Sequence, residues 1–426
     1  MFDCLIYELL INILLRLPVK TLVICICTCR TLQSFITSPN FIAAYTNKSK
    51  QNSFVFLKYH TDSFGKNIKR VNEYFWLHPD NNSLNVKDFK GKNLPMKCYG
   101  SYFYKIVGCC NGVICLTCNS SATSYIIYLW NPSIRKYIHV PDPNVMYKTH
   151  GRFNNVCLGF GFNELANDYK IIRVVYIHRI DLFEEVPVLV EVYSVSARSW
   201  RYIENSSPNH LLQMQQCTQC FFKGAIHWMG YNRLNRGLSA IVTFDVVDES
   251  FGEVKLPASL EGSNSSFRGL INRVCWDMLA LIQVNSGCCQ IWVMKKYGVA
   301  DSWTKMFTYA HPTLRPIMPA ISIRKNKDIL MLTTKSELIW EIQDATMDNF
   351  LHRLRAFENF KVPDITMLSA QRIGDKMEEL GVVTEPLREC YLASYEESLA
   401  LFNEGEPIIG DVIEDDAIKD NNLRSQ

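Results

Sequence analysis

Residues 128–137 read YLWNPSIRKY, and this stretch decides the fold. Two strand-forming runs flank a polar turn, and the aromatic residues Trp130 and Tyr137 stand seven positions apart. That gap fits two short strands joined as a hairpin, with the aromatic rings free to pack against a neighbouring sheet. The stretch therefore predicts one β-hairpin of a larger β-structure.

The same pattern recurs four more times. The leading aromatic residues follow one another at spacings of 63, 51, 48 and 48 residues. The later pairs are Tyr193/Trp200, Phe244/Phe251, Trp292/Trp303 and Trp340/Phe350. Three or four strands in about 50 residues is the period of a kelch-type β-propeller. Aromatic residues occur in any β-protein, but five pairs at this spacing favour the propeller.

Two other segments complete the predicted body. Residues Ser53 to Pro95 are strand-like and have room for a further blade, so we expect six or seven blades. Residues 370–388 contain Ile373, Met377, Leu380 and Leu387 at roughly helical spacing. This spacing predicts a surface helix inserted before the closing strand.

The first 40 residues have a different period. Apolar residues recur at helical spacing and form one stripe: Leu5, Ile6, Leu9, Leu10, Ile13, Leu14 and Leu17. Pro18 ends this helix, and Thr21 is expected to be the N-cap of a second one that continues to Ile36. A unit of this size cannot bury its own stripe well. It either packs on the rest of the chain or offers the stripe to a partner.

Three segments of this helical unit resemble a plant F-box. They are residues 14–22 (LLRLPVKTL), 27–30 (CTCR) and 34–41 (SFITSPNF). The resemblance implies docking on the SKP-type adaptor of a cullin ubiquitin ligase. The residues that it implies for adaptor binding are Leu5, Leu9, Ile13, Leu14, Leu17, Pro18 and Leu22.

The chain departs from the F-box pattern at five positions. Ile6 replaces the usual proline, and Asn12 replaces an acidic residue. Ile24 and Ile26 stand where the family has basic residues, and Leu32 where it has tryptophan. With these changes, a helical unit that no longer binds the adaptor is an open alternative.

The body is similar to the F-box-associated domain of plant F-box/kelch-repeat proteins. The matching segments are residues 107–115, 129–137, 159–162 with 167–173, 190–195 with 199–200, 291–294 with 302–305, and 395–401. We therefore expect an α+β multidomain chain, in which a small N-terminal helical F-box precedes an all-β kelch-like propeller. Within that group the pollen S-locus F-box proteins are similar in pattern. That likeness implies a role in pollen self-incompatibility, with a stylar ribonuclease as the target.

Three domains are expected. Residues 1–45 form the F-box, residues 46–402 the propeller, and residues 403–426 a disordered acidic tail. The tail holds seven acidic and two basic residues, hence a charge of −5. Such an excess of like charge is typical of a solvated segment.

The composition limits the kinds of partner and the cellular compartment that we expect. The net charge of +3 indicates neither nucleic acid nor membrane as a partner. The sequence has no secretory signal and no apolar run that reaches a membrane span. Its 16 cysteines are therefore expected to be reduced and mostly buried, in the cytoplasm or alternatively the nucleus.

The sequence contains only weak candidates for a catalytic or metal-binding site. Cys115/Cys118 and Cys217/Cys220 have the spacing of zinc ligands, but a strand would point Cys115 and Cys118 to opposite faces. None of the nine histidines lies beside a nucleophile motif, so no cofactor, metal or enzymatic activity is expected.

We expect the substrate-recognition subunit of an SCF-type ubiquitin ligase, linked through its adaptor to a cullin. Its target-binding residues are unknown; by position they lie in loops 141–151, 179–186, 206–215 and 231–238. The first alternative is a propeller scaffold or decoy with a degenerate F-box. The second is a propeller enzyme.

Overall fold

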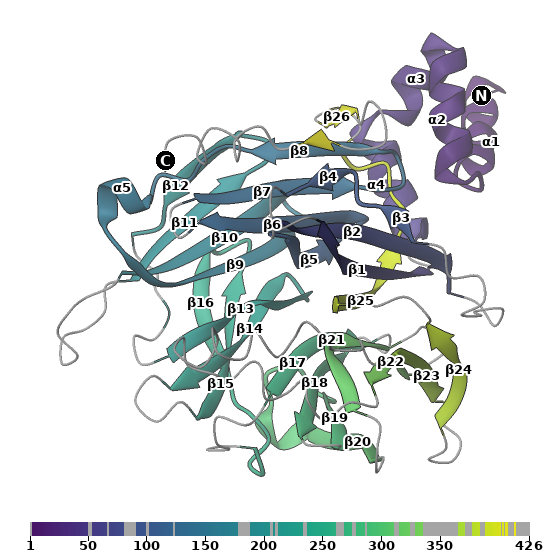
Figure 1. Cartoon of the computed structure of the whole chain (residues 1–426). Helices are drawn as coiled ribbons and strands as arrows, with labels where there is room; N and C mark the ends of the chain where they lie inside the picture. The colour runs from purple at the N-terminus through teal and green to yellow at the C-terminus, as the bar shows by residue number, and fades with distance from the viewer. Residues whose placement is uncertain are drawn as a thin grey trace.

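The computed structural model describes most of the chain. The described residues are 2–49, 53–65, 68–80, 91–98, 102–121, 124–177, 188–204, 208, 212–232, 237–260, 268–274, 278–285, 288–310, 315–323, 329–334, 365–370, 377–383, 388–401, 403, 405–407 and 413–414. In this part of the chain a helical head precedes a body made almost wholly of strands (Figure 1).

Four helices form the head. They are α1 (Phe2–Leu14), α2 (Val19–Thr28), α3 (Arg30–Ile36) and α4 (Pro39–Ser49). Helix α2 begins directly after Pro18, which is extended. A proline fits there because the first helical turn needs no backbone donor from it. The predicted N-cap at Thr21 is therefore wrong, since Thr21 already lies inside α2.

The described strands of the body form six sheets of four or five strands, which we number I to VI in their order around the body. Within each sheet the strands are given from the first, inner strand to the outer edge. Sheet I is β25 (Arg388–Glu396), β1 (Ser53–Gly65), β2 (Ile68–Pro79) and β3 (Lys92–Asn93). Sheet II is β5 (Tyr104–Cys110), β6 (Val113–Ser121), β7 (Ser124–Asn131), β8 (Lys136–Val140) and β26 (Glu406–Pro407). Sheet III is β9 (Phe153–Asn163), β10 (Asp168–Ile177), β11 (Val188–Ser194) and β12 (Ser199–Tyr202).

The second half of the body continues the series. Sheet IV is β13 (Leu212–Phe222), β14 (Ala225–Asn232), β15 (Leu238–Asp245) and β16 (Ser250–Val254). Sheet V is β17 (Arg268–Val274), β18 (Met278–Asn285), β19 (Cys288–Met294) and β20 (Trp303–Ala310). Sheet VI is β21 (Arg315–Ile323), β22 (Ile329–Thr334), β23 (Ile365–Ala370) and β24 (Met377–Val383). Smaller elements are the pair β4 (Met96–Lys97) and β27 (Ile413–Glu414), helix α5 (Tyr147–His150) and the 3-10 turn η2 (Ala300–Ser302).

The first strands of the sheets contact one another in a closed order. Strand β25 touches β5, β5 touches β9, and β9 touches β13; β13 then touches β17, β17 touches β21, and β21 returns to β25. Apolar cores fill the spaces between neighbouring sheets, as between sheets I and II around Trp130 and between sheets III and IV around Trp228. Antiparallel sheets arranged radially in this way make a β-propeller. The β-propeller prediction is confirmed.

The propeller has two different faces. Because neighbouring strands are antiparallel, the turn after the first strand and the turn after the third strand of each sheet lie on one face, which we call the turn face. The head lies on the turn face, since its apolar core includes Leu399 and contacts Ile134 in the β7–β8 turn. The remaining connections, including α5, lie on the opposite, loop face. Figure 1 shows the head and α5 at opposite ends of the strands.

The ring is closed by the C-terminal part of the chain. Strand β25 pairs with β1 and so becomes the first strand of a sheet that the N-terminal part of the body began. Buried Asn131 holds the segment after β25, because its Nδ2 donates to the carbonyls of Ser398 at 3.0 Å and Ala400 at 2.9 Å. The Tyr395 hydroxyl donates to the Gly112 carbonyl at 3.1 Å.

The aromatic pairs are confirmed where the gap is seven residues. Trp130 stands opposite Tyr137, Tyr193 opposite Trp200, and Phe244 opposite Phe251. The fourth pair is wrong as a direct pair, because Trp292 faces Lys305 and Trp303 faces Met294. The longer turn there contains η2, and the register shifts between Ile291 and Trp292. The fifth pair, Trp340/Phe350, lies outside the described residues.

Two further expectations need correction. Residues Met377–Val383 form strand β24 instead of a surface helix, because their backbone pairs with β23 and sheet pairing outweighs the local apolar spacing. Part of the expected disordered tail is also ordered. Glu406–Pro407 pairs with the edge of sheet II, and Ile413–Glu414 pairs with Met96–Lys97.

Replacement of Asn131 by alanine tests the closure. The variant Asn131→Ala leaves buried carbonyls of Ser398 and Ala400 without a donor, so the free energy of unfolding should fall by about 2–3 kcal/mol. Urea denaturation followed by tryptophan fluorescence measures this change. The same substitution at exposed Asn40 is the control and should change stability by less than about 0.5 kcal/mol. Equal effects at the two sites would contradict the role given to Asn131.

Candidate functional site

The residues expected to bind the adaptor divide into two groups in the structure. Leu14 and Leu22 are buried in the core of the head with Val19, Ile26 and Ile36. Leu9 and Ile13 are exposed on α1, at 55% and 59% of their surface, and Pro18, between α1 and α2, is also exposed. Leu17 is half-buried, and the side chain of Leu5 lies outside the described residues.

This division changes what each residue can do. Leu14 and Leu22 hold the helices together, so a polar substitution there would test folding of the head. Leu9 and Ile13, which we call the docking patch, are available to a partner. Ile24, one of the departures from the F-box pattern, is also exposed, on α2. Exposed apolar residues gathered on one small unit are typical of a binding surface.

The head is joined to the propeller by more than the chain that links them. Leu399 is buried in the head's core, and the Nδ2 atom of Asn403 donates to the Thr37 carbonyl at 3.0 Å. The Tyr45 hydroxyl donates to the Leu17 carbonyl at 2.9 Å, within the head. Burial raises the pKa of the Glu397 carboxyl, and the nearby charge of Lys20 partly opposes this. Leu399 and Asn403 therefore fix the head against the turn face.

On the loop face, a buried ion pair organises loop 141–151. Arg173 Nη1 lies 2.7 Å from Glu191 Oε2, and both side chains are almost fully buried. Glu191 Oε1 accepts the backbone N–H groups of Asn144 at 2.8 Å and Val145 at 3.0 Å. Arg173 donates to the Val145 carbonyl at 2.8 Å. Two buried charges thus hold the backbone of this loop in one conformation.

The outer part of this loop carries cations. Lys148 and Arg152 are exposed, and neither forms an ion pair with any residue that the structure describes. Arg152 Nε donates to the Tyr147 hydroxyl at 3.3 Å, which orients both side chains. Of the other expected target loops, 179–186 lies outside the described residues, and 206–215 and 231–238 lie only partly within them.

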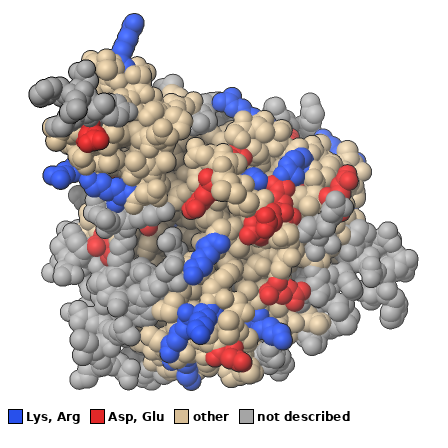
Figure 2. Space-filling view, turned by 180° about the vertical axis from the view of Figure 1, so that it is seen from behind, with Lys and Arg blue, Asp and Glu red and all other residues tan. Residues whose placement is uncertain are grey.

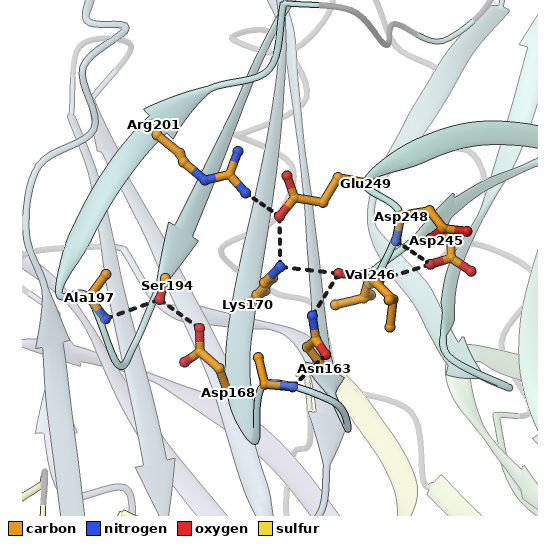
Figure 3. Close-up of polar contacts among 12 residues, drawn as sticks. Asn163, Asp168, Lys170, Ser194, Ala197, Arg201, Asp245, Val246, Asp248 and Glu249 are labelled. Carbon is orange, nitrogen blue, oxygen red and sulfur yellow. Dashed lines mark hydrogen bonds and ion pairs between the residues drawn. The ribbon is translucent and has the colours of Figure 1, made fainter.

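The turn face holds a second polar network, between sheets III and IV (Figure 3). Lys170 Nζ lies 2.7 Å from Glu249 Oε1 and donates to the Val246 carbonyl at 3.2 Å. Arg201 meets the same Glu249 carboxylate from β12, with more than half of its side chain exposed. Its two cationic partners lower the pKa of Glu249 against the opposing effect of its partial burial. No sequence pattern indicated this network, since Lys170 and Arg201 lie 79 and 48 positions before Glu249.

Sheets IV and V are joined by a histidine. His227 is fully buried; its Nε2 lies 2.7 Å from the Tyr297 hydroxyl and its Nδ1 lies 3.2 Å from the Cys220 carbonyl. Burial lowers the pKa of His227 to about 4. This histidine is a neutral structural link at physiological pH.

Cys115 and Cys118 do not form a metal site within the described residues, and the side chain of Cys217 in the second pair lies outside them. Cys115 and Cys118 are buried on β6 but belong to different cores, so their thiols point to opposite sides of the strand as expected. No group of three or more histidine, cysteine, aspartate or glutamate residues in the described part is arranged to hold a metal ion. No helix there is long and apolar enough to cross a membrane. On the side shown in Figure 2, acidic and basic side chains are interspersed.

A helical head with an apolar patch, fixed to a β-propeller, defines a class of binding proteins. Two known protein families match the two parts of the chain. Residues 2–43 match the F-box domain, and residues 41–361 match the F-box associated beta propeller domain. The chain therefore belongs to the F-box proteins that carry an F-box-associated β-propeller.

Individual proteins are more distant. The F-box protein CPR1 of Arabidopsis thaliana is 25% identical over 352 residues, which cover 77% of this chain and 79% of CPR1. The Arabidopsis F-box/kelch-repeat protein At3g23880 is 23% identical over 318 residues, covering 71% of this chain and 78% of the relative. Among solved structures, a prolyl endopeptidase matches with a TM-score of 0.39 and 9% identity, over 81% of this chain and 52% of that one. That likeness is too weak to support an argument.

The buried pair predicts unequal costs for two arginine–glutamate contacts. Glu191→Ala leaves Arg173 charged and buried, and should lower the free energy of unfolding by about 3–5 kcal/mol. The control Arg201→Ala breaks an ion pair whose arginine is exposed and should cost less than about 1 kcal/mol. Chemical denaturation at pH 7 measures both. Similar losses would show that burial of the Arg173–Glu191 pair does not matter.

The buried histidine predicts a pH dependence. An unfolded histidine takes up a proton near pH 6.5, whereas folded His227 stays neutral down to about pH 4. Stability should therefore fall as the pH is lowered through this window, with a slope of up to about 1.4 kcal/mol per pH unit. Urea midpoints at several pH values measure the slope, and His227→Gln should remove this contribution. An unchanged slope in the variant would contradict the assignment.

Proposed function

We propose that this protein is the substrate-recognition subunit of an SCF-type E3 ubiquitin ligase. The main support for this proposal is the distribution of apolar side chains in the head. Leu14 and Leu22 are buried in its core, whereas Leu9 and Ile13 on α1 are exposed to solvent. A buried core beneath an exposed apolar patch is what docking on another protein requires. The SKP-type adaptor is the partner expected for an F-box domain, and a cullin would follow through that adaptor.

The adaptor-binding set is refined by burial. Leu9, Ile13 and Pro18 would contact the adaptor directly, and Leu5 and half-buried Leu17 complete the proposed set. Leu14 and Leu22 would act indirectly, by holding α1 and α2 in place. Docking through α1 also explains how the departures at Ile26 and Leu32 are tolerated, because Ile26 is buried and Leu32 is half-buried in the head's own core.

The target would bind on the loop face. That face lies across the propeller from the head, so a bound target and a docked adaptor would not compete for space. Loop 141–151 is the best-supported contact within the described residues, because Glu191 and Arg173 fix its backbone before any target arrives. A loop that is already ordered loses less conformational entropy on binding.

Catalysis would belong to other subunits. The chain's own contribution is proximity, since a target held on the propeller meets the ubiquitin-conjugating enzyme at a raised effective concentration. The rigid joint made by Leu399 and Asn403 supports this role, because it limits the distances that the target lysines can sample. No enzymatic step is assigned to the protein itself.

Finer features belong to the proposal as well. The six sheets and their closed contacts support six kelch-like blades, the lower of the two expected numbers. A cytoplasmic or nuclear location follows from ligase function. Action in pollen self-incompatibility on a stylar ribonuclease stays a prediction that rests on the resemblance to S-locus F-box proteins.

The function is tested by adaptor binding. Full-length protein with Leu9→Asp and Ile13→Asp should lose binding to a purified plant SKP-type adaptor by at least about 100-fold, because charged groups would be placed in an apolar contact. Isothermal titration calorimetry measures the affinity. The control Leu165→Asp changes an exposed leucine on the propeller and should leave adaptor affinity unchanged.

The alternatives are separated by the same experiment. Loss of binding only in the Leu9/Ile13 variant supports the ligase receptor. If the folded wild-type chain does not bind any SKP-type adaptor, the docking patch has lost its function and the propeller acts as a scaffold or decoy. The exposure of Ile24, where F-box domains carry a basic residue, is the observation that favours this second candidate.

A further inference from the structure

The turn face carries an apolar surface away from the head. Six large apolar side chains are exposed on the described part of the propeller, and four of them lie in turns on this face. We call these four the apolar rim: Leu165, Val247, Tyr297 and Val299. Leu165 is the most exposed, at 83% of its surface. They come from the turns of sheets III, IV and V, which are consecutive around the ring.

The turns that carry the apolar rim are tied to one another. Asn163 Nδ2 donates to the Val246 carbonyl at 3.4 Å, which fixes the turn of Leu165 against the turn of Val247. Lys170 and Arg201 reach Glu249 in the same turn, as Figure 3 shows. The contact between His227 and the Tyr297 hydroxyl continues the series into sheet V. The rim is therefore a firm surface, and binding there would not require these turns to become ordered.

Charge divides this surface into two halves. Beside Leu165 and Val247, the acidic residues Glu164 and Asp248 are exposed. Beside Tyr297 and Val299, the basic residues Lys295 and Lys296 are exposed. None of these four charged side chains forms an ion pair with a described residue.

Charges of the opposite sign lie nearby in both halves, and in the acidic half Arg201 and Lys170 are already paired with Glu249. Arg198 is exposed in the next turn of sheet III, and Asp301 follows Val299 in sheet V. Lys223, whose Nζ lies 6.0 Å from the centre of the Tyr297 ring, adds to the basic half. Each half thus joins two apolar side chains to an excess of one sign of charge.

We propose that the apolar rim is the interface for a second copy of this chain. In a two-fold dimer the same surface of both copies meets, so each half must complement the other half. The rim has that property: its acidic half would face the partner copy's basic half, and the four apolar residues would be covered. A partner that covers the whole rim must match both signs of charge, and a second copy of this chain carries both signs beside equal apolar pairs.

Dimerisation through the apolar rim is independent of adaptor docking. The head is fixed at sheets I and II, and sheet IV lies across the ring from sheet I. A dimer through the rim would therefore leave both docking patches unoccupied. Such a dimer would present two heads and two loop faces, which strengthens binding to any target that carries two copies of the recognised segment.

A charge exchange tests the interface. Variant A carries Lys295→Glu and Lys296→Glu, so both halves of its rim are acidic. Variant B carries Glu164→Lys and Asp248→Lys, so both halves are basic. Sedimentation velocity of the full-length wild type at 1–100 μM (roughly the range of weak to moderate association) should show a monomer–dimer equilibrium. Variants A and B alone should each weaken it at least 10-fold.

Mixing the two variants gives the decisive result. An equimolar mixture of A and B should restore dimers, because every acidic half then meets a basic half; restoration also proves that both variants are folded. Tyr102→Asp, which changes an exposed aromatic residue away from the rim, and the Leu9/Ile13 variant should dimerise like the wild type. A wild type that is monomeric throughout, or a dimer that neither A nor B weakens, or a mixture that stays monomeric would overturn the proposal.

Discussion

The pairing of β25 with β1 is the constraint on which the rest of the structure depends. It places a strand from the C-terminal part of the chain beside the first strand of the body, so every sheet of the ring has two neighbours and β1 is paired along both of its sides. The same segment continues through Ser398 and Leu399 into the head, where Leu399 completes the apolar core. Ring closure and placement of the head are therefore one event, held by Asn131 and a few neighbours.

The sequence predicted what repeats. A gap of seven residues between aromatic positions identified three hairpins in the correct register, because that gap is set by local turn geometry. It failed at Trp292, where a longer turn with its own 3-10 geometry shifts the register. Local spacing also misassigned residues 377–383, since the pairing with β23 that makes them a strand cannot be seen in their own pattern.

The candidate sites were predictable only in part. The apolar stripe of α1 was visible in the sequence, but a stripe alone does not say which side faces inward; Leu14 and Leu22 proved internal, and Leu9 and Ile13 external. The ion pairs were not predictable, because Arg173 and Glu191 face each other only in the register of β10 and β11, and loop 141–151 meets them only in the folded chain. Burial of such charges is costly, and here Glu191 and Arg173 hydrogen-bond the backbone of loop 141–151.

Closure of the ring by β25 has a consequence for synthesis of the protein on the ribosome. A ribosome releases the head and five sheets before it releases β25, so for most of synthesis β1 presents an unpaired edge and the head lacks Leu399. The nascent chain must be protected from association through that edge until its last part emerges. A prematurely terminated product would lack both the closing strand and the completed core of the head. Only a chain translated through β25 and Leu399 can therefore assemble the head correctly on the propeller.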